Sequence, residues 1–313
     1  MEGTPLWGID LGGTKVEGVV LKSADNPEVI SRIRVATEQE HGYDHILGQI
    51  NKLVDLLKED SGLKPDVIGI GTPGIIDPVT NFMKNSNTVV LNHKPFKFDL
   101  EKRLGIPLLM MNDANCFALA ETQMGVVKEE CPGASVVFGV ILGTGVGGGV
   151  VFDGKAWKGK MGNGGEWGHN FLDESGGPCY CGKSGCVENV ISGPALQRYY
   201  QSIGGDSLSM KEIYAKYKEG DDKATQCIER LLHFFAVGIS SVINILDPDA
   251  IVLGGGVGNI PELYTLGVQK TLHYVFNDKL ITAFLRPKLG DSAGVFGAAF
   301  LCKDFLPTTG SKD

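Results

Sequence analysis

The sequence predicts an α/β protein built from two domains. Its 313 residues suffice for two hydrophobic cores of ordinary size. Two glycine-rich segments, Trp7–Leu21 and one that begins at Val136, each predict a β-hairpin. Around them, apolar residues at helical spacing alternate with short β-branched runs, as in proteins whose helices pack on a sheet.

The two hairpins resemble each other when Gly8 is aligned with Gly139 without gaps. Identities then include Leu11 with Leu142 and Gly18 with Gly149. A duplicated domain explains the match, although glycine-rich hairpins also resemble one another by composition alone.

The other expected elements follow from periodicity and from turn residues. Polar residues end several strands, and a polar, turn-rich segment follows the tight loop Thr72–Gly74 as far as Asn92, which is typical of functional loops. The expected elements are a helix over 43–57, a strand over 67–71, a helix over 99–104, a strand over 107–111, a helix over 117–124, a helix over 224–246, a strand over 250–253 and a closing helix over 294–301.

The segment Gly165–Glu188 contains the ligands of a closed zinc site. Cys179, Cys181 and Cys186 follow His169 on one loop, whose proline and glycines favour tight turns over any regular helix or strand. Four protein ligands fill a tetrahedral shell, so the zinc would be structural. The alternative is that these are ordinary buried cysteines or a disulfide pair with one thiol left over, as in a secreted scaffold. Glu166 and Glu188 would be held beside the metal.

Composition and charge restrict the partners. A net charge of −8 without a cluster of Lys and Arg argues against nucleic acid. The chain begins with Met1 and Glu2 just before a predicted strand, so we expect a cytoplasmic protein without a secretory signal. The apolar run 134–152 is nearly long enough to span a membrane, but its glycine-rich centre favours two strands.

Glycine turns expose backbone N–H groups and are therefore candidate anion sites. Gly143, Gly145 and Gly148 satisfy the dinucleotide fingerprint, but that fingerprint requires a helix directly after the glycines. Here a strand continues through Phe152, which disfavours a dehydrogenase. Two facing glycine hairpins instead indicate the phosphate clamp of the actin-like ATPase (ribonuclease H-like) fold.

Six motifs together resemble the ROK family of sugar kinases and repressors, in the family's order and nearly from end to end. Within it, the sequence is most similar to bacterial fructokinases that also take mannose, and next to bacterial N-acetylglucosamine kinases. The DNA-binding head of the repressors is missing. The motifs are Asp10–Lys15, Asn112–Cys116, Leu142–Gly149, Glu166–His169, the cysteine loop and Leu253–Gly256.

The resemblance implies two α/β domains with a central cleft that binds ATP, Mg²⁺ and a hexose. Residues 1–117 would form the first domain, completed by a C-terminal helix over about 294–313, and residues 118–293 the second, with the zinc loop. Asp113 would be the catalytic base toward the sugar's 6-hydroxyl, and Asp10 would hold magnesium through water. Alternatively, Asp113 is only a helix cap and Asp10 only a turn residue.

The remaining site residues are assigned in the same way. The expected sugar ligands are Gly74, Asn87, Asn112, Asp113, Glu166, His169 and Glu188. The expected ATP site is Asp10, Gly12, Gly13, Thr14, Lys15, Gly143, Thr144, Gly145, Gly147, Gly254, Gly255 and Gly256.

Fructose is the expected substrate, with mannose or glucose weaker, because Trp167 and Asn170 match the fructokinase pattern. The alternatives are an N-acetylglucosamine kinase or glucokinase, a sugar-sensing regulator without turnover, and an actin-like structural ATPase. We expect a homodimer, no membrane partner and no nucleic-acid partner.

Overall fold

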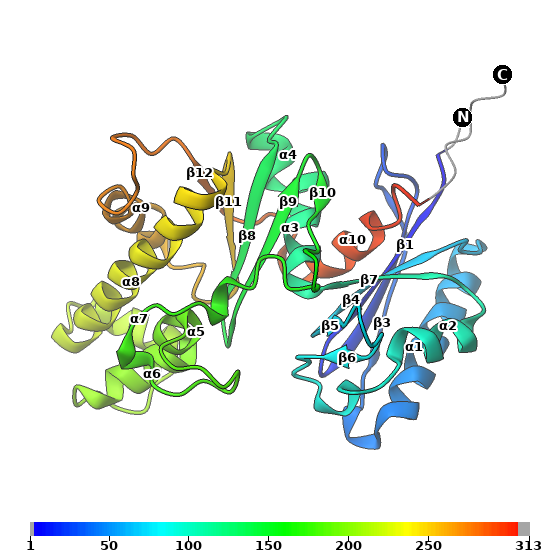
Figure 1. Cartoon of the computed structure of the whole chain (residues 1–313), viewed down its shortest axis with the longest axis horizontal. Helices are drawn as coiled ribbons and strands as arrows, with labels where there is room; N and C mark the ends of the chain where they lie inside the picture. Colours follow the sequence, from blue (N-terminus) through cyan, green and yellow to red (C-terminus); the bar gives the residue numbers. More distant parts are fainter. Residues whose placement is uncertain (1–2, 306–313) are drawn as a thin grey trace. The chain divides into compact units, whose positions relative to one another are not determined.

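The computed structural model describes residues 3–305, which divide into two compact α/β units (Figure 1). Unit 1 contains the chain up to Lys128, Gly154–Gly164 and the chain from Leu289 on. Unit 2 contains Glu129–Asp153 and Gly165–Lys288. The expected helix residues 306–313 lie outside the described part.

The elements are given in chain order. Unit 1 contains β1 (Leu6–Leu11), β2 (Lys15–Leu21), β3 (Val29–Ala36), η1 (Gln39–His41), α1 (Tyr43–Ser61), β4 (Ile68–Thr72), β5 (Ile75–Ile76), β6 (Met83–Lys84), η2 (Val89–Leu91), α2 (Phe96–Leu104), β7 (Leu108–Asn112), α3 (Asp113–Gln123), most of α4 (Val126–Glu130), β10 (Lys155–Ala156), η6 (Gly290–Ser292) and α10 (Ala293–Phe300). Unit 2 contains β8 (Val136–Leu142), β9 (Val146–Phe152), η3 (Trp167–His169), η4 (Glu174–Gly176), α5 (Val187–Ile191), α6 (Gly193–Ser202), α7 (Met210–Lys218), α8 (Asp222–Leu246), β11 (Ala250–Gly254), η5 (Pro261–Tyr264), α9 (Leu266–Thr271) and β12 (Ala283–Leu285).

The sheet of unit 1 has the order β3-β2-β1-β4-β7. Strands β1, β2 and β3 are antiparallel, whereas β4 and β7 run parallel to β1. The carboxyl ends of three parallel strands therefore meet at one edge, where Asp10 pairs with Gly71 and Thr72 pairs with Asn112. Ligands of open α/β sheets bind at such edges.

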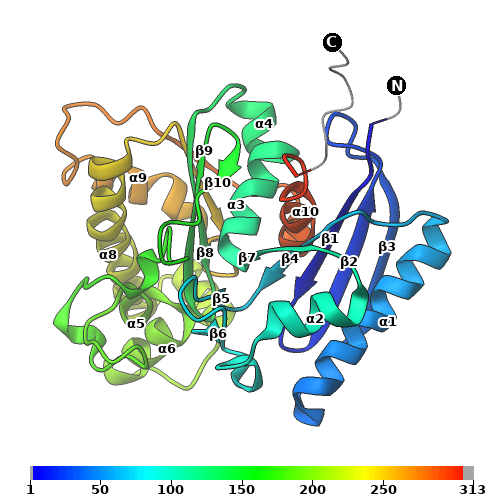
Figure 2. The same ribbon diagram turned by 45° about the vertical axis from the view of Figure 1, so that its right-hand side comes forward.

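Helix α10 packs directly on the backbone of this sheet, as predicted for a closing helix of small residues. It lies with α3 on one face, opposite α1 and α2 (Figure 2). A Cβ atom on Gly8 or Gly69 would clash with backbone oxygens of α10, and one on Gly297 would clash with the backbone of Cys116 in α3. This close packing places α3 in unit 1, so the division falls after Lys128 instead of after residue 117.

Unit 2 repeats the same topology. Its strands are ordered β9-β8-β11-β12, with β11 and β12 parallel to β8. Helices α5, α6 and α8 share one hydrophobic core with the sheet. Helix α8 is long and apolar enough to cross a membrane by length and composition, but 56% of its apolar window is buried in the structure.

The two hairpins differ by one residue in their turns. Leu11 pairs with Val16 in the first, whereas Leu142 pairs with Val146 in the second. The alignment without gaps is therefore wrong in the second strand, because Gly139 pairs with Gly149 where Gly8 pairs with Val19. The shared strand order supports a duplicated domain with one residue lost from the second turn.

Candidate functional site

Two carboxylates lie at the strand ends of unit 1. Asp10 belongs to β1, and Asp113 is the first residue of α3, directly after β7. Glycines make room for the Asp10 carboxylate: a Cβ on Gly294 would lie 2.9 Å from its Oδ2, and one on Gly71 would lie 3.2 Å from its Oδ1.

The environment of Asp10 favours its neutral form. Burial, followed by the charges of Asp113 and Glu17, raises the pKa of Asp10 to about 7, and Lys15 opposes this shift. Both protonation states are therefore populated near neutral pH. A divalent cation would favour the ionised form, so this carboxylate suits the predicted magnesium ligand.

Glu17 lies opposite Asp10 across the first hairpin and is almost fully buried. Burial by itself would raise its pKa, but hydrogen bonds from Arg32 and Arg34 outweigh this effect and lower the pKa. Their Nε atoms lie 2.6 and 2.9 Å from its oxygens. The paired charge keeps Glu17 ionised behind Asp10.

The N-cap of α3 is Asn112. The alternative that Asp113 is only a helix cap is therefore wrong about the capping residue. Asn112 Oδ1 accepts from the N–H of Asn115 (3.0 Å) and from Asn115 Nδ2 (2.7 Å). A hydrogen bond from Asn112 to a sugar would therefore have to come from its Nδ2. Burial raises the pKa of Asp113, opposed by the N–H of Ala114 at 2.8 Å, yet its side chain remains accessible to solvent.

The Gly74 turn lies against the segment that carries Asn87. A Cβ on Gly74 would lie 2.7 Å from the carbonyl oxygen of Lys84, so only glycine permits this approach. The N–H of Asn87 donates to the carbonyl of Pro73 (3.4 Å), and the Asn87 side chain is exposed. The structure thus brings these two predicted sugar ligands together.

The turn Gly12–Thr14 of the first hairpin is partly closed on itself. The N–H of Gly12 donates to the carbonyl of Lys15 (3.0 Å), and Thr37 Oγ1 donates to the carbonyl of Gly12 (2.7 Å). The amide of Gly12 is therefore used within the turn, and a contact of Gly12 with ATP stays a prediction. Lys15 Nζ lies 3.7 Å from Glu17.

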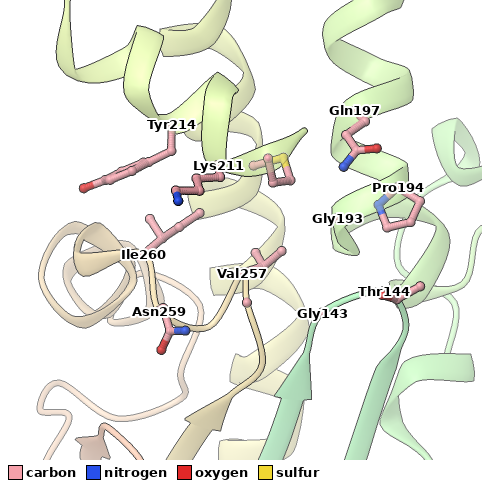
Figure 3. A pocket seen from close by; sticks show the side chains of 12 residues that line it. Gly143, Thr144, Gly193, Pro194, Gln197, Lys211, Tyr214, Val257, Asn259 and Ile260 are labelled. Carbon is pink, nitrogen blue, oxygen red and sulfur yellow. The ribbon is translucent and has the colours of Figure 1, made fainter. Parts of the chain in front are cut away.

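Unit 2 contains a cavity of about 520 Å³, a volume typical of small-molecule sites (Figure 3). The turn of the second hairpin and the loop after β11 form one side, and α6 and α7 form the other. It is lined by Gly143, Thr144, Gly193, Pro194, Gln197, Met210, Lys211, Tyr214, Gly256, Val257, Asn259 and Ile260.

Three predicted nucleotide residues line this cavity: Gly143, Thr144 and Gly256. A Cβ on Gly143 would lie 3.8 Å from the nitrogen of Gly256, so the two glycine turns adjoin. The predicted residues outside the lining are Gly145, Gly147, Gly254 and Gly255. Gly255 instead has a positive φ of 84° and supports the turn, because a Cβ there would clash with the carbonyl of Leu142.

The lining residues of α6 and α7 were missed because neither helix was predicted from the sequence. A signal for α6 exists in Ser192 followed by Pro194, a capping residue and an early helical proline. For Lys211 and Tyr214, the capping box Ser209–Glu212 would have indicated the start of α7 but not that it faces a cavity.

His169, Cys179, Cys181 and Cys186 meet as predicted, with their ligand atoms all within 4.8 Å of one another. Cys179 Sγ lies 3.6 Å from His169 Nδ1, and Cys181 Sγ lies 3.6 Å from Cys186 Sγ. Zn–S bonds of about 2.3 Å in a tetrahedron separate two sulfurs by roughly 3.8 Å. The cluster therefore fits a closed zinc site.

Without a metal, the surroundings of Cys186 favour its neutral thiol. Burial, followed by hydrogen bonds with Cys181 and Cys179, raises the pKa of Cys186 to about 12. A divalent cation removes this penalty by stabilising the thiolates. The four cysteines outside the loop, Cys116, Cys131, Cys227 and Cys302, are free thiols.

The second ring nitrogen of His169 has a partner within the same loop. Its Nε2 lies 2.9 Å from the hydroxyl of Tyr180, and the two rings are perpendicular. A metal on Nδ1 with a hydrogen bond on the other ring nitrogen is the usual arrangement of a zinc histidine. A sugar hydroxyl would have to displace Tyr180 to reach Nε2.

Trp167 lies in the core of unit 2. Its Nε1 donates to the carbonyl of Gly238 (3.1 Å), and its ring packs edge-on against Phe138. The residue therefore anchors the loop, and Glu166 directly precedes it at the start of η3.

Glu188 belongs to α5, so the expectation of no helix in this segment is wrong at its end. Its Oε2 accepts from the N–H of Val146 (3.0 Å), directly after the turn of the second hairpin. The charges of Glu188 and Glu166 both raise the pKa of Tyr180, after the larger effect of burial, so both carboxylates do lie near the metal loop.

Each unit, taken by itself, contains groups of a kind that phosphoryl transfer uses. Unit 1 offers a carboxylate for a proton and another for a cation, and unit 2 offers a nucleotide-sized cavity beside glycine turns. Little covalent chemistry is needed beyond positioning and charge neutralisation.

Comparison with known proteins shows the family and the fold of the chain. The sequence model of the ROK family matches residues 6–305. The N-acetyl-D-glucosamine kinase of Histophilus somni (strain 129Pt) is 35% identical over 311 residues, covering 95% of this chain and 99% of the relative. The crystal structure of the ROK hexokinase from Thermus thermophilus has a TM-score of 0.83 at 30% identity, covering 95% of this chain and 97% of that one. A ROK family glucokinase from Streptomyces griseus, in complex with glucose and AMPPNP, has a TM-score of 0.74 at 29% identity, covering 95% and 99%.

Proposed function

Because this chain belongs to the ROK family and has the actin-like ATPase fold, we propose that it is an ATP-dependent sugar kinase that phosphorylates the 6-hydroxyl of a hexose. The observation that carries the proposal is the placement of Asp113. Its carboxylate stands at the head of α3, electrostatically coupled to Asp10, with a pKa raised by burial.

Asp113 acts as the general base in this proposal. It accepts the proton of the 6-hydroxyl as that oxygen attacks the γ-phosphorus of ATP, and ADP leaves. A raised pKa suits the role, because it brings the pKa of Asp113 closer to the working pH than the ordinary value of a carboxyl group. Mg²⁺, held by Asp10 through water, supplies charge neutralisation when bound.

The nucleotide occupies the cavity of unit 2. Its apolar residues, Val257 and Ile260 among them, suit a base, and Gly143 and Thr144 bring backbone close to the phosphates. The sugar is bound by Gly74, Asn87, Asn112, Asp113, Glu166, His169 and Glu188, and the zinc centre holds the last three in place.

For the sugar we propose two candidates, fructose and N-acetyl-D-glucosamine. Fructose rests on the resemblance of the cysteine loop and of Asn170 to fructokinases. N-acetyl-D-glucosamine rests on the relative from Histophilus somni, which is named for that substrate and aligned over almost its whole length. Trp167 favours neither sugar by contact, because it is buried in the core.

One assay tests both the activity and the sugar. ATP consumption is followed with fructose, mannose, glucose and N-acetyl-D-glucosamine in parallel, and NMR of the product locates the phosphate. Substrates that differ by one small group in a pocket are separated by about 1–3 kcal/mol, so their kcat/KM values should differ about tenfold or more. Sugar binding without ATP consumption would favour the regulator, and a phosphate on another hydroxyl would contradict the assignment of the 6-position.

We further propose a cytoplasmic homodimer, on the family resemblance alone. Light scattering coupled to gel filtration measures the mass in solution, and a monomer at micromolar concentration would contradict this proposal.

A further inference from the structure

The turn Gly143–Gly145 is held at both ends by one short segment of chain. After the turn, the N–H of Val146 donates to Glu188 Oε2 (3.0 Å). Before it, the carbonyl of Gly143 accepts from the N–H of Gly193 (2.8 Å). Both partners belong to the segment Cys186–Gly193.

The contact between this segment and the turn is close. A Cβ on Gly145 would lie 2.6 Å from Glu188 Oε2, so glycine is required for the carboxylate to reach the turn. A Cβ on Gly193 would lie 3.3 Å from the carbonyl oxygen of Gly143. Gly193 and Pro194 also line the nucleotide cavity together with Gly143 and Thr144, so the segment ends inside the proposed ATP site.

The other end of the segment is the metal centre. Cys186 belongs to the Cys3His cluster and is also the residue that precedes α5 as its N-cap. Next to it, the N–H of Val187 donates to the carbonyl of Asn170 (2.9 Å), and Asn189 Nδ2 donates to the carbonyl of Pro178 (2.7 Å). These bonds fasten α5 to the loop that carries the ligands.

Helix α5 spans only five residues, from Val187 to Ile191. A helix of this length is not stable by itself, so its position depends on its packing in the core of unit 2, where Val187, Val190 and Ile191 are buried, and on what holds its ends. One end is Cys186, and the other is Ser192, which accepts from the N–H of Ala195 as the cap of α6. Loss of the metal would therefore loosen the Cys186 end of the segment that supports the turn.

We propose that the segment Cys186–Gly193 is a strut through which the zinc centre fixes the phosphate-binding turn, with Glu188 as a positioning residue for the nucleotide. The inference rests on the proposed ATP site and deepens it. It assigns the metal an effect on nucleotide affinity that is present without any sugar.

The test measures ADP binding by calorimetry on the zinc-loaded protein in the absence of sugar, so that contacts of Glu188 with sugar play no part. Glu188→Ala removes the acceptor for Val146 N–H and should weaken ADP binding about tenfold, the effect of one hydrogen bond to a charged group. Glu188→Gln keeps an oxygen at that position and should stay within about threefold of wild type. Glu174→Ala is the matched control, because it removes an exposed glutamate that lies outside the segment Cys186–Gly193, and with zinc saturated it should bind ADP like wild type.

Hydrogen exchange of a peptide covering residues 143–146 gives a second measurement that needs no variant. Removing zinc from the wild type with a chelator should speed exchange at this peptide and weaken ADP binding. The proposal is contradicted if Glu188→Ala retains zinc and binds ADP like wild type. It is also contradicted if zinc removal leaves hydrogen exchange at the turn unchanged. Wild-type protein that binds no ADP would instead contradict the proposed function.

Discussion

The Nε2 atom of His169 lies 2.9 Å from the hydroxyl of Tyr180, while its Nδ1 faces the thiol of Cys179 at 3.6 Å. The ring is thus held from both sides, with its metal-binding nitrogen directed into the cysteine cluster. Tyr180 belongs to the same loop, between two of the cysteines, and is otherwise largely exposed.

Replacing Tyr180 with Phe should lower zinc affinity by about tenfold, because partners that orient a metal-bound histidine contribute at least that much. Competition with a chromophoric chelator measures the change. Tyr274→Phe is the control, since its hydroxyl also approaches a histidine nitrogen (His233 Nδ1, 3.4 Å) but lies outside the cluster. Equal zinc affinity in the two variants would show that the Tyr180 hydroxyl does not contribute to zinc binding.

Replacing Asp113 with Asn should leave sugar binding nearly intact and lower kcat by roughly 10²–10⁴, the contribution of a positioned general base. The wild type should lose kcat as the pH falls, because the raised pKa of Asp113 leaves more of the carboxyl protonated. Steady-state rates between pH 5 and 9 and sugar binding by calorimetry check both statements. A variant within tenfold of wild type would show that another group takes the proton.

Magnesium binding should weaken as the pH falls through about 7, because protons compete for Asp10, whose pKa is raised to about 7. Well below that pH, the apparent magnesium affinity should drop about tenfold per pH unit, as expected for one competing proton. Rates at saturating ATP and sugar, with magnesium varied at each pH, measure it. A magnesium affinity that does not change with pH would show that Asp10 is not part of the magnesium site.

Asp10 should reduce the stability of the metal-free protein at pH values above about 7. A carboxyl group whose pKa is raised in the folded state stabilises the fold at pH values below its ordinary pKa of 3.8. This contribution is lost as the pH rises to about 7. Asp10→Asn should therefore raise Tm at pH 8 by a few degrees, on the order expected for about 1 kcal/mol, and change it little near pH 4. Calorimetric melting in chelator checks the sign, and a lower Tm at pH 8 would contradict it.

Replacing Cys181 with Ser, or removing the metal, should lower stability and raise the KM for sugar together, since Glu166, His169 and Glu188 all depend on the loop. Elemental analysis of freshly purified protein, melting curves and kinetics measure these effects. Cys131→Ser is the matched control, because that thiol lies outside the loop. Protein purified without zinc yet fully active would contradict a structural metal.

Local sequence patterns predicted the structural features that are formed by residues close together in the chain. Alternating apolar residues around glycines predicted both hairpins, helical spacing predicted α1 and α8, and ligand spacing predicted the cysteine cluster. These signals are local because strand alternation, helix periodicity and a metal loop are each specified within about 20 residues.

Long-range packing determined the roles of individual side chains, which no local pattern encodes. Trp167 turns into the core because a carbonyl of α8 accepts its N–H, and Glu188 reaches the second hairpin because Gly145 leaves space for it. Lys211 and Tyr214 line the cavity only because α7 packs beside α6. Contacts between residues far apart in sequence depend on how whole elements pack, and this packing set which polar groups were buried, paired or left lining the cavity.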